Sequence, residues 1–210
     1  MTIENRSLSD FSQIVLEGNG ELILVHGDSP AVVIETDPET LEHIKTEVVA
    51  GKLILGMKSW LDSILHGWKR VTYTVTYRQL ESVSISGSGK ARAALLESNR
   101  FRFTVSGSGS LIVETLTSSD LEVHISGSAH LNLNGSVSRQ VVHISGSAKM
   151  EAWALESKTA EVRISGSGEL MLKVSDALDV AISGSGSVRF LGSPKVTQSI
   201  SGSGSIKPMG

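Results

Sequence analysis

Val162-Arg163-Ile164-Ser165-Gly166-Ser167-Gly168 is one of seven copies of a pattern that decides the fold of this chain. In each copy, Ser-Gly-Ser-Gly or Ser-Gly-Ser-Ala follows a Val or Ile, and the tetrapeptides begin at Ser86, Ser106, Ser126, Ser145, Ser165, Ser183 and Ser201. The copies are therefore spaced by 18 to 20 residues. A constant spacing of this size is typical of proteins in which one supersecondary unit is stacked along an axis.

Apolar residues alternate with other residues on both sides of each tetrapeptide, which is the period of a β-strand. The apolar pairs before the tetrapeptide are Val83/Ile85, Phe103/Val105, Val123/Ile125, Val142/Ile144, Val162/Ile164 and Val180/Ile182. Those after it are Ala91/Ala93, Leu111/Val113, Leu131/Leu133, Met150/Ala152, Leu170/Leu172 and Val188/Phe190. Each copy thus predicts two short strands, which pair in parallel with their equivalents in the next copy. The expected fold is all-β, a right-handed parallel β-helix (solenoid) of about 20-residue coils.

The second residue of the tetrapeptide is glycine in every copy, whereas the fourth is alanine at Ala129 and Ala148. An invariant glycine fits a corner with φ above zero, where a Cβ is unfavourable. We therefore expect a structural turn at Gly87, Gly107, Gly127, Gly146, Gly166, Gly184 and Gly202.

Residues 1–80 are expected to form an irregular N-terminal β-rich cap segment, continuous with regular β-helix repeats over residues 81–210. Residues 14–24 fit the repeat as a degenerate first coil, with Gly18 in place of the tetrapeptide glycine. Asp37 and Pro38 predict the start of a short helix over residues 40–44. Further strands are predicted at residues 31–36, 45–50, 52–57 and 71–77, with a hairpin turn at Ala50-Gly51.

The composition excludes several classes of function. Nineteen basic and 22 acidic side chains give a formal net charge of −3, and no Lys/Arg run occurs, so nucleic acid is not an expected partner. The chain has no cysteine, which excludes disulfides, thiolate catalysis and cysteine-based zinc sites. No transmembrane segment is expected because no stretch of 18 apolar residues occurs, and the first residues lack the apolar region of a signal peptide.

Three features of the sequence occur together. They are the repeated Val-x-Ile-Ser-Gly-Ser-Gly motif, the Gly-Asn-Gly-Glu-Leu stretch that begins at Gly18, and the closing Gly-Ser-Pro-Lys-Val-Thr-Gln-Ser-Ile-Ser-Gly-Ser-Gly of residues 192–204. In these features the chain resembles, over nearly its whole length, the bacterial family called putative auto-transporter adhesin, head GIN domain. The resemblance implies a β-helical domain that is exported or associated with the cell envelope, and it offers no catalytic residue.

Side chains between the inward pairs should point outward and stack from coil to coil. They include Ser84, Thr104, His124, His143, Arg163, Ala181 and Ser199, and a neighbouring outward column holds Arg102, Glu122, Val141, Glu161 and Asp179. We expect a surface site at Glu122, His124, His143 and Arg163. The two imidazoles beside Glu122 could bind a transition metal or respond to pH, or they could form an ordinary polar face. No metal ligand and no cofactor is assigned.

The expected function is a non-catalytic binding or structural module of the bacterial cell envelope or surface, with an adhesin-like role and a protein or glycan partner. The alternative is a carbohydrate-active β-helical enzyme, a polysaccharide lyase or hydrolase. Such an enzyme needs acid and base groups clustered in a cleft. Glu122, Glu161 and Asp179 could supply them, but alternating charges along a regular ladder are also what solubility requires. The chain is therefore not expected to be an enzyme.

Residues 60–68 break the strand pattern. Their apolar side chains fall on one face of a helix, at Trp60, Leu61, Ile64, Leu65 and Trp68. This amphipathic segment is expected either to cover the end of the fold or to contact a protein partner, which includes a second copy in a small homo-oligomer. Contact with a membrane surface is the remaining alternative.

Overall fold

The computed structural model describes residues 1–66 and 69–209; within helix α2 the side chains of Trp60, Ser63 and Leu65 lie outside this description, as do Gly67, Trp68 and Gly210. The part described is all-β apart from two short helices, and its thirteen strands belong to one sheet that does not close on itself. The strands are β1 (Thr2–Ser7), β2 (Gln13–Gly18), β3 (Glu21–His26), β4 (Ala31–Thr36), β5 (Ile44–Val49), β6 (Lys52–Met57), β7 (Thr72–Tyr77), β8 (Ser82–Gly87), β9 (Lys90–Gly166), β10 (Glu169–Gly184), β11 (Ser187–Leu191), β12 (Lys195–Gly202) and β13 (Ser205–Pro208). The helices are α1 (Pro38–Leu41) and α2 (Trp60–His66).

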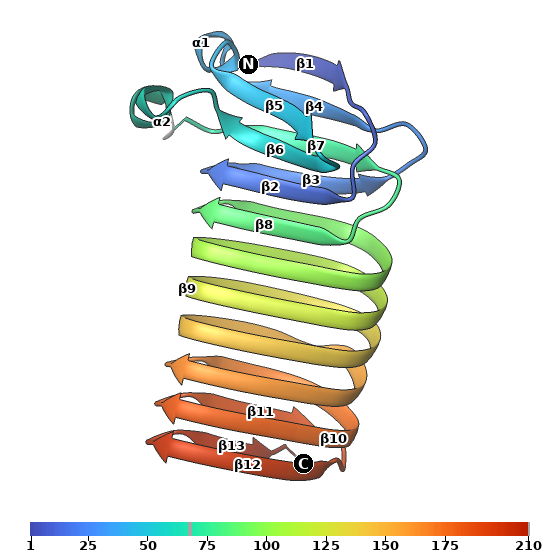
Figure 1. Ribbon diagram of the computed structural model, residues 1–210, viewed down its shortest axis with the longest axis vertical. Helices are drawn as coiled ribbons and strands as arrows, with labels where there is room; N and C mark the ends of the chain where they lie inside the picture. The colour runs from blue at the N-terminus through green and yellow to red at the C-terminus, as the bar shows by residue number, and fades with distance from the viewer. Residues whose placement is uncertain (67–68, 210) are drawn as a thin grey trace.

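Successive copies of the sequence pattern lie side by side and in register. Strand β8 pairs in parallel with β9 so that Gly87 lies opposite Gly107, and β10 pairs with β9 so that Gly184 lies opposite Gly166. On its other side β10 pairs with β12, which brings Gly202 opposite Gly184. Figure 1 shows the result as turns of chain stacked along the long axis, with β9 continuing through several of them.

The hydrophobic core runs along the inside of these stacked turns. All twelve apolar pairs predicted from the alternation are buried, with exposed fractions of 6% or less. The short connection that closes each turn also contributes side chains to the core, at Leu96, Leu116, Val137, Leu155 and Val174. The alternation of apolar residues therefore predicted correctly which side chains face inward.

The tetrapeptide forms a corner at which glycine is required for two reasons. All seven of its second-position glycines have φ between +115° and +129°. A Cβ at Gly146 would also collide with the carbonyl oxygen of Gly127 on the adjacent turn. A second, unpredicted corner uses glycine in the same way at Gly135 and Gly192, where a Cβ would meet the carbonyl oxygens of Leu116 and Val174.

The N-terminal segment joins this stack in register. Strand β2 pairs in parallel with β8, with Gly18 opposite Gly87, and β3 pairs with β9, with Leu22 opposite Ala91. Residues 14–18 and 21–24 therefore pair in the register expected for a first copy of the repeat.

The parallel pairing expected for the repeats does not extend through the N-terminal segment, so the description of the whole sheet as a parallel β-helix is corrected to a mixed sheet. Strands β1 and β4, β4 and β7, and β5 and β6 pair antiparallel. The turn between β5 and β6 explains one of these pairs, because Ala50 and Gly51 have φ of 50° and 74°, the backbone of a tight hairpin. The sheet is consequently mixed.

The two helices lie at the end of the molecule that holds β1, β5 and β6 (Figure 1). Helix α1 begins at Pro38 and is shorter than the predicted span. Its N-cap is Asp37, whose Oδ1 accepts a hydrogen bond from the backbone N–H of Thr40 at 3.0 Å. In the described chain, neither helix is long and apolar enough to cross a membrane.

Candidate functional site

A groove of about 640 Å³ runs across several turns on one face of the stack. Its lining includes six of the seven residues of the first outward column, and the serines that open the neighbouring tetrapeptides form its other side. The six are Thr104, His124, His143, Arg163, Ala181 and Ser199. The residues come from β9, β10 and β12, so the regular register of the strands is what brings them together.

His124 and His143 lie on adjacent turns with their rings stacked. The ring centroids are 5.1 Å apart and the planes are inclined by 2°. Nε2 of His124 lies 2.7 Å from Oε1 of Glu122, and the other oxygen of that carboxylate forms an ion pair with Arg102 at 2.6 Å. The structure thus places Glu122, His124 and His143 together, with the carboxylate already engaged by two partners.

These contacts fix the charge state of Glu122. The hydrogen bond from His124 and the contact with Arg102 hold the pKa of the Glu122 carboxyl below its ordinary value of 4.5. Glu122 is therefore a carboxylate at neutral pH, and it cannot serve there as a protonated general acid.

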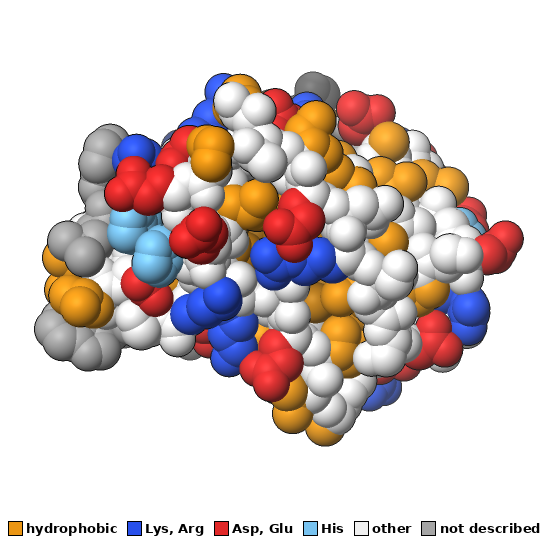
Figure 2. All heavy atoms as spheres, turned by 90° about the horizontal axis from the view of Figure 1, so that it is seen from above, with side chains coloured by type: hydrophobic (Ala, Val, Ile, Leu, Met, Phe, Trp, Pro, Cys, Tyr) orange, Lys and Arg blue, Asp and Glu red, His pale blue; other side chains and the backbone are white. Residues whose placement is uncertain are grey.

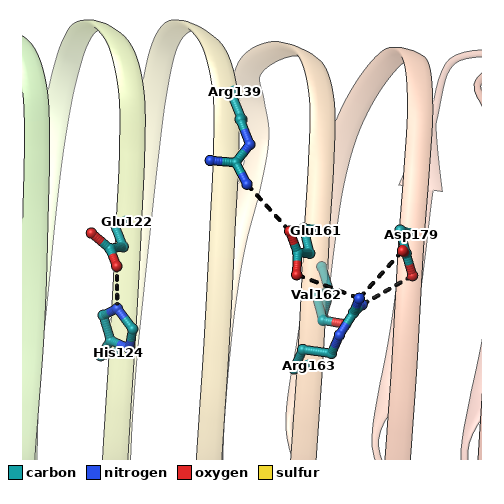
Figure 3. Close-up of polar contacts among 7 residues, drawn as sticks. All are labelled: Glu122, His124, Arg139, Glu161, Val162, Arg163 and Asp179. Atoms are coloured by element: carbon teal, nitrogen blue, oxygen red, sulfur yellow. Dashed lines mark hydrogen bonds and ion pairs between the residues drawn. The ribbon is translucent and has the colours of Figure 1, made fainter.

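Arg163 lies on the same face but is held by a different set of carboxylates (Figure 3). Its guanidinium donates to both oxygens of Asp179, at 3.0 and 3.3 Å, and forms an ion pair with Glu161 at 3.4 Å. Arg139 reaches the same Glu161 at 3.2 Å. The Arg163–Asp179 and Arg139–Glu161 pairs join adjacent turns, whereas the Arg163–Glu161 pair lies within one turn, so Glu161 and Asp179 of the second outward column are held in ion pairs beside the groove.

A second groove, which the sequence did not reveal, lies over the connection that closes each turn. Its volume is about 760 Å³, and most of its lining is serine and threonine, with Glu156, Lys158 and Lys173 at its polar edge. Beneath it, the buried side chain of Gln140 donates from Nε2 to Oγ of Ser157 at 2.7 Å. Sequence alone missed this groove because its residues belong to no constant motif.

The predicted partner segment is only partly described. Leu61 and Ile64 are exposed on α2, by 50% and 61%. Trp68 and the side chains of Trp60 and Leu65 fall outside the described residues. The expectation of a partner contact here thus remains a prediction.

A group of possible metal ligands, which the sequence did not predict, lies where α2 meets the chain that follows α1. Here His43, Asp62 and His66 each bring one donor atom within 4.8 Å of the others. Among the residues described, this is the group of three or more donors that could hold a metal ion. The signal in the sequence was the spacing of Asp62 and His66 at i and i+4, but nothing in the sequence showed that His43 lies beside them.

Solved structures with the same fold come from several bacteria. A structure described as a putative adhesin from Bacteroides fragilis aligns with a TM-score of 0.90 at 21% identity, over 99% of this chain and 96% of that one. A putative lipid binding protein from Parabacteroides distasonis aligns at 0.79 and 22%, over 100% and 96%. A putative adhesin from Parabacteroides merdae aligns at 0.75 and 19%, over 100% and 96%.

No curated protein sequence matches the chain. A family model, in contrast, matches residues 10–194, which include all but the last tetrapeptide and every residue of the His124 groove except Ser199 and Ser201. The chain therefore belongs to the family described as putative auto-transporter adhesin, head GIN domain.

Proposed function

We propose that this protein is a non-catalytic, adhesin-like binding module of the bacterial cell envelope or surface, and that it binds its partner along the groove lined by His124, His143 and Arg163. The observation that carries the proposal is the groove itself, which crosses several turns and is lined by side chains in a regular column. The family name and the structures described as adhesins support a role at the cell surface.

The proposal includes an architecture. The stacked turns of residues 81–210 act as a right-handed parallel β-helix, and residues 1–80 continue it and cap its N-terminal end. The parallel registers at intervals of one sequence copy support this reading. A solenoid of this kind presents outward side chains at the strand spacing of about 4.8 Å, which suits an extended ligand.

The chemistry of the groove favours a ligand with hydroxyl and carboxylate groups. Serine hydroxyls can donate and accept hydrogen bonds, and the guanidinium of Arg163 can exchange its longer contact with Glu161, at 3.4 Å, for an acidic group of the ligand. The rings of His124 and His143 face each other, so the pair offers ring nitrogens to a sugar hydroxyl or a peptide group. A glycan or an extended protein segment meets these requirements.

The ion pairs argue against the alternative of a glycan-cleaving enzyme. Glycoside hydrolysis requires one carboxylic acid with a raised pKa near a second carboxylate. The pKa of Glu122 is lowered instead, and Glu161 and Asp179 are paired with arginines. Glu122, Glu161 and Asp179 are thus engaged in ion pairs beside the groove.

A glycan array and a reducing-sugar release assay on the same preparation test the proposal. We expect binding to a subset of glycans, richest in acidic ones, with no release of reducing ends from any glycan that binds. Release that is lost in the variant Glu161→Gln or Asp179→Asn would replace the proposal with the enzymatic alternative.

Helix α2 is the proposed contact for a further protein partner or a second copy of the chain, because Leu61 and Ile64 expose large apolar side chains. Light scattering over a concentration series checks this. The double variant Leu61→Ser with Ile64→Ser should dissolve any small oligomer, and an oligomer that persists in this variant would place the contact elsewhere.

A further inference from the structure

The antiparallel pairing of β5 and β6 places His43 beside the start of α2. The ladder ends with Ile44 opposite Met57. One residue further along, the backbone N–H of Lys58 donates to the carbonyl of His43 at 2.8 Å, and Nζ of Lys58 donates to the carbonyl of Glu42 at 2.6 Å. The backbone of His43 is therefore fixed next to the residues that lead into α2.

Helix α2 presents Asp62 and His66 four residues apart, which puts them on one face. Ser59 fixes the first of them, since its hydroxyl accepts from the N–H of Asp62 at 3.1 Å and donates to Oδ2 at 2.8 Å. The other oxygen, Oδ1, lies 2.8 Å from Nδ1 of His43.

His66 is the least exposed member of the group, with 9% of its surface accessible. Its ring stacks on that of His43, with centroids 4.5 Å apart. Within residues 1–66 and 69–209, its buried Nδ1 has no hydrogen-bond partner, while Nε2 lies 3.7 Å from Oε1 of Glu39. A buried polar nitrogen is normally paired, and a metal-bound histidine typically turns its second nitrogen toward a carboxylate.

We infer that His43, Asp62 and His66 bind one Zn²⁺ or Ni²⁺ ion. Their three donor atoms lie within 4.8 Å of one another. Zn²⁺ binds nitrogen and oxygen at about 2.0–2.2 Å, so two ligands lie at most roughly 4.2 Å apart. The stacked rings of His43 and His66 must therefore turn toward each other for both to face one ion. Two imidazoles and a carboxylate favour these ions over Ca²⁺ and Mg²⁺, which prefer oxygen ligands alone.

The ion would link α2 to the segment between α1 and β5, with water in the remaining position. Figure 2, which looks onto this end of the molecule, shows histidine side chains gathered beside acidic ones at its surface, within reach of solvent. Metal binding would therefore fasten α2, with its exposed Leu61 and Ile64, to the end of the sheet.

Calorimetric titration of the full, tag-free chain with zinc chloride tests the inference. We expect one ion per chain, with affinity reduced about tenfold or more by Asp62→Asn and by His43→Asn. Cobalt chloride supplies a second readout, because a tetrahedrally bound Co²⁺ absorbs visible light strongly. This absorption should appear in the parent protein and be lost in Asp62→Asn.

The other stacked histidine pair provides matched controls. His124→Ala and His143→Ala should bind zinc as the parent does. Stoichiometric zinc binding that is abolished by His143→Ala and retained in Asp62→Asn would overturn the inference, as would the absence of zinc binding in the parent protein. His66→Ala is a third ligand variant, and it is used only if its circular dichroism spectrum matches that of the parent protein. The test with Asp62→Asn and His43→Asn does not depend on it.

Discussion

The substitution Gly146→Ala tests why the tetrapeptide keeps its glycine. Gly146 has φ of +129°, a backbone conformation that costs a residue with a Cβ about 1–3 kcal/mol. The new Cβ would also collide with the carbonyl oxygen of Gly127, which belongs to the backbone of the adjacent turn and cannot move independently.

Relief of this collision requires the two turns to separate locally. The carbonyl of Gly146 accepts a hydrogen bond from the N–H of Ser167 at 2.9 Å, and displacement of the corner weakens it at a cost of about 1 kcal/mol. The expected loss in the free energy of unfolding is therefore about 2–4 kcal/mol. For a chain of this size, this corresponds to a fall in Tm of roughly 5–15 °C.

Gly168→Ala is the matched control, because it adds the same methyl group two residues further along the same corner. Its Cβ would meet side-chain atoms and no backbone atom of the adjacent turn, with Ile144 Cδ1 at 3.2 Å and Ile164 Cγ2 at 3.3 Å. Other copies already carry alanine at this place, at Ala129 and Ala148. Urea unfolding followed by circular dichroism should show a change within about 0.5 kcal/mol for this variant. Equal losses for both variants, or no loss for Gly146→Ala, would refute the argument from backbone conformation.

Three further variants probe other parts of the structure. Glu122→Gln should lower the free energy of unfolding at pH 7 by less than about 1 kcal/mol, because the pair is partly exposed. Because folding lowers the pKa of Glu122, its carboxylate stabilises the fold above the ordinary pKa of 4.5, and this stabilisation is lost as the pH falls through the folded-state pKa. A difference in the free energy of unfolding between the parent and Glu122→Gln that widens toward pH 3 would contradict this. Gln140→Leu should raise stability by about 1 kcal/mol, since Oε1 of the buried Gln140 lacks a partner in the described chain, and a lower urea midpoint would show that the amide is needed. Ala50→Gly should raise Tm slightly because Ala50 has φ of 50°, and an unchanged or lower Tm would show that this turn is not strained.

The regular part of the fold could be predicted because the inward positions require apolar residues and the corner requires glycine. The inward pairs follow from alternation, and Gly18 could be aligned with the later tetrapeptide glycines because both stand at the same corner. Among the antiparallel strands, β4 to β7 could be located and the hairpin turn at Ala50-Gly51 indicated that β5 pairs with β6, whereas β1 was not predicted. The place of β1 depends on contacts between distant residues, such as Arg6 with Thr46 at 2.7 Å, which no local pattern encodes.

The sequence predicted the His124–His143 pair better than the group of His43, Asp62 and His66. The stacking of His124 on His143 follows from the repeat, because a shift of one copy brings equivalent residues together. The position of His43 beside Asp62 instead depends on the register of β5 with β6 and on how α2 is attached, and neither is repeated. The buried Gln140 replaces an apolar residue at a core position, and only the structure shows its bond to Ser157.

The claim that the groove of His124, His143 and Arg163 is the binding surface is tested most directly by comparing the two grooves. The measurement is the Kd of a ligand identified on the array for the double variants His143→Ala/Arg163→Ala and Lys158→Ala/Lys173→Ala. The first pair should raise Kd about tenfold or more, which corresponds to about 1.4 kcal/mol, and the second pair, in the serine-rich groove, should leave it unchanged. A Kd that rises only in the second double variant would contradict the proposal.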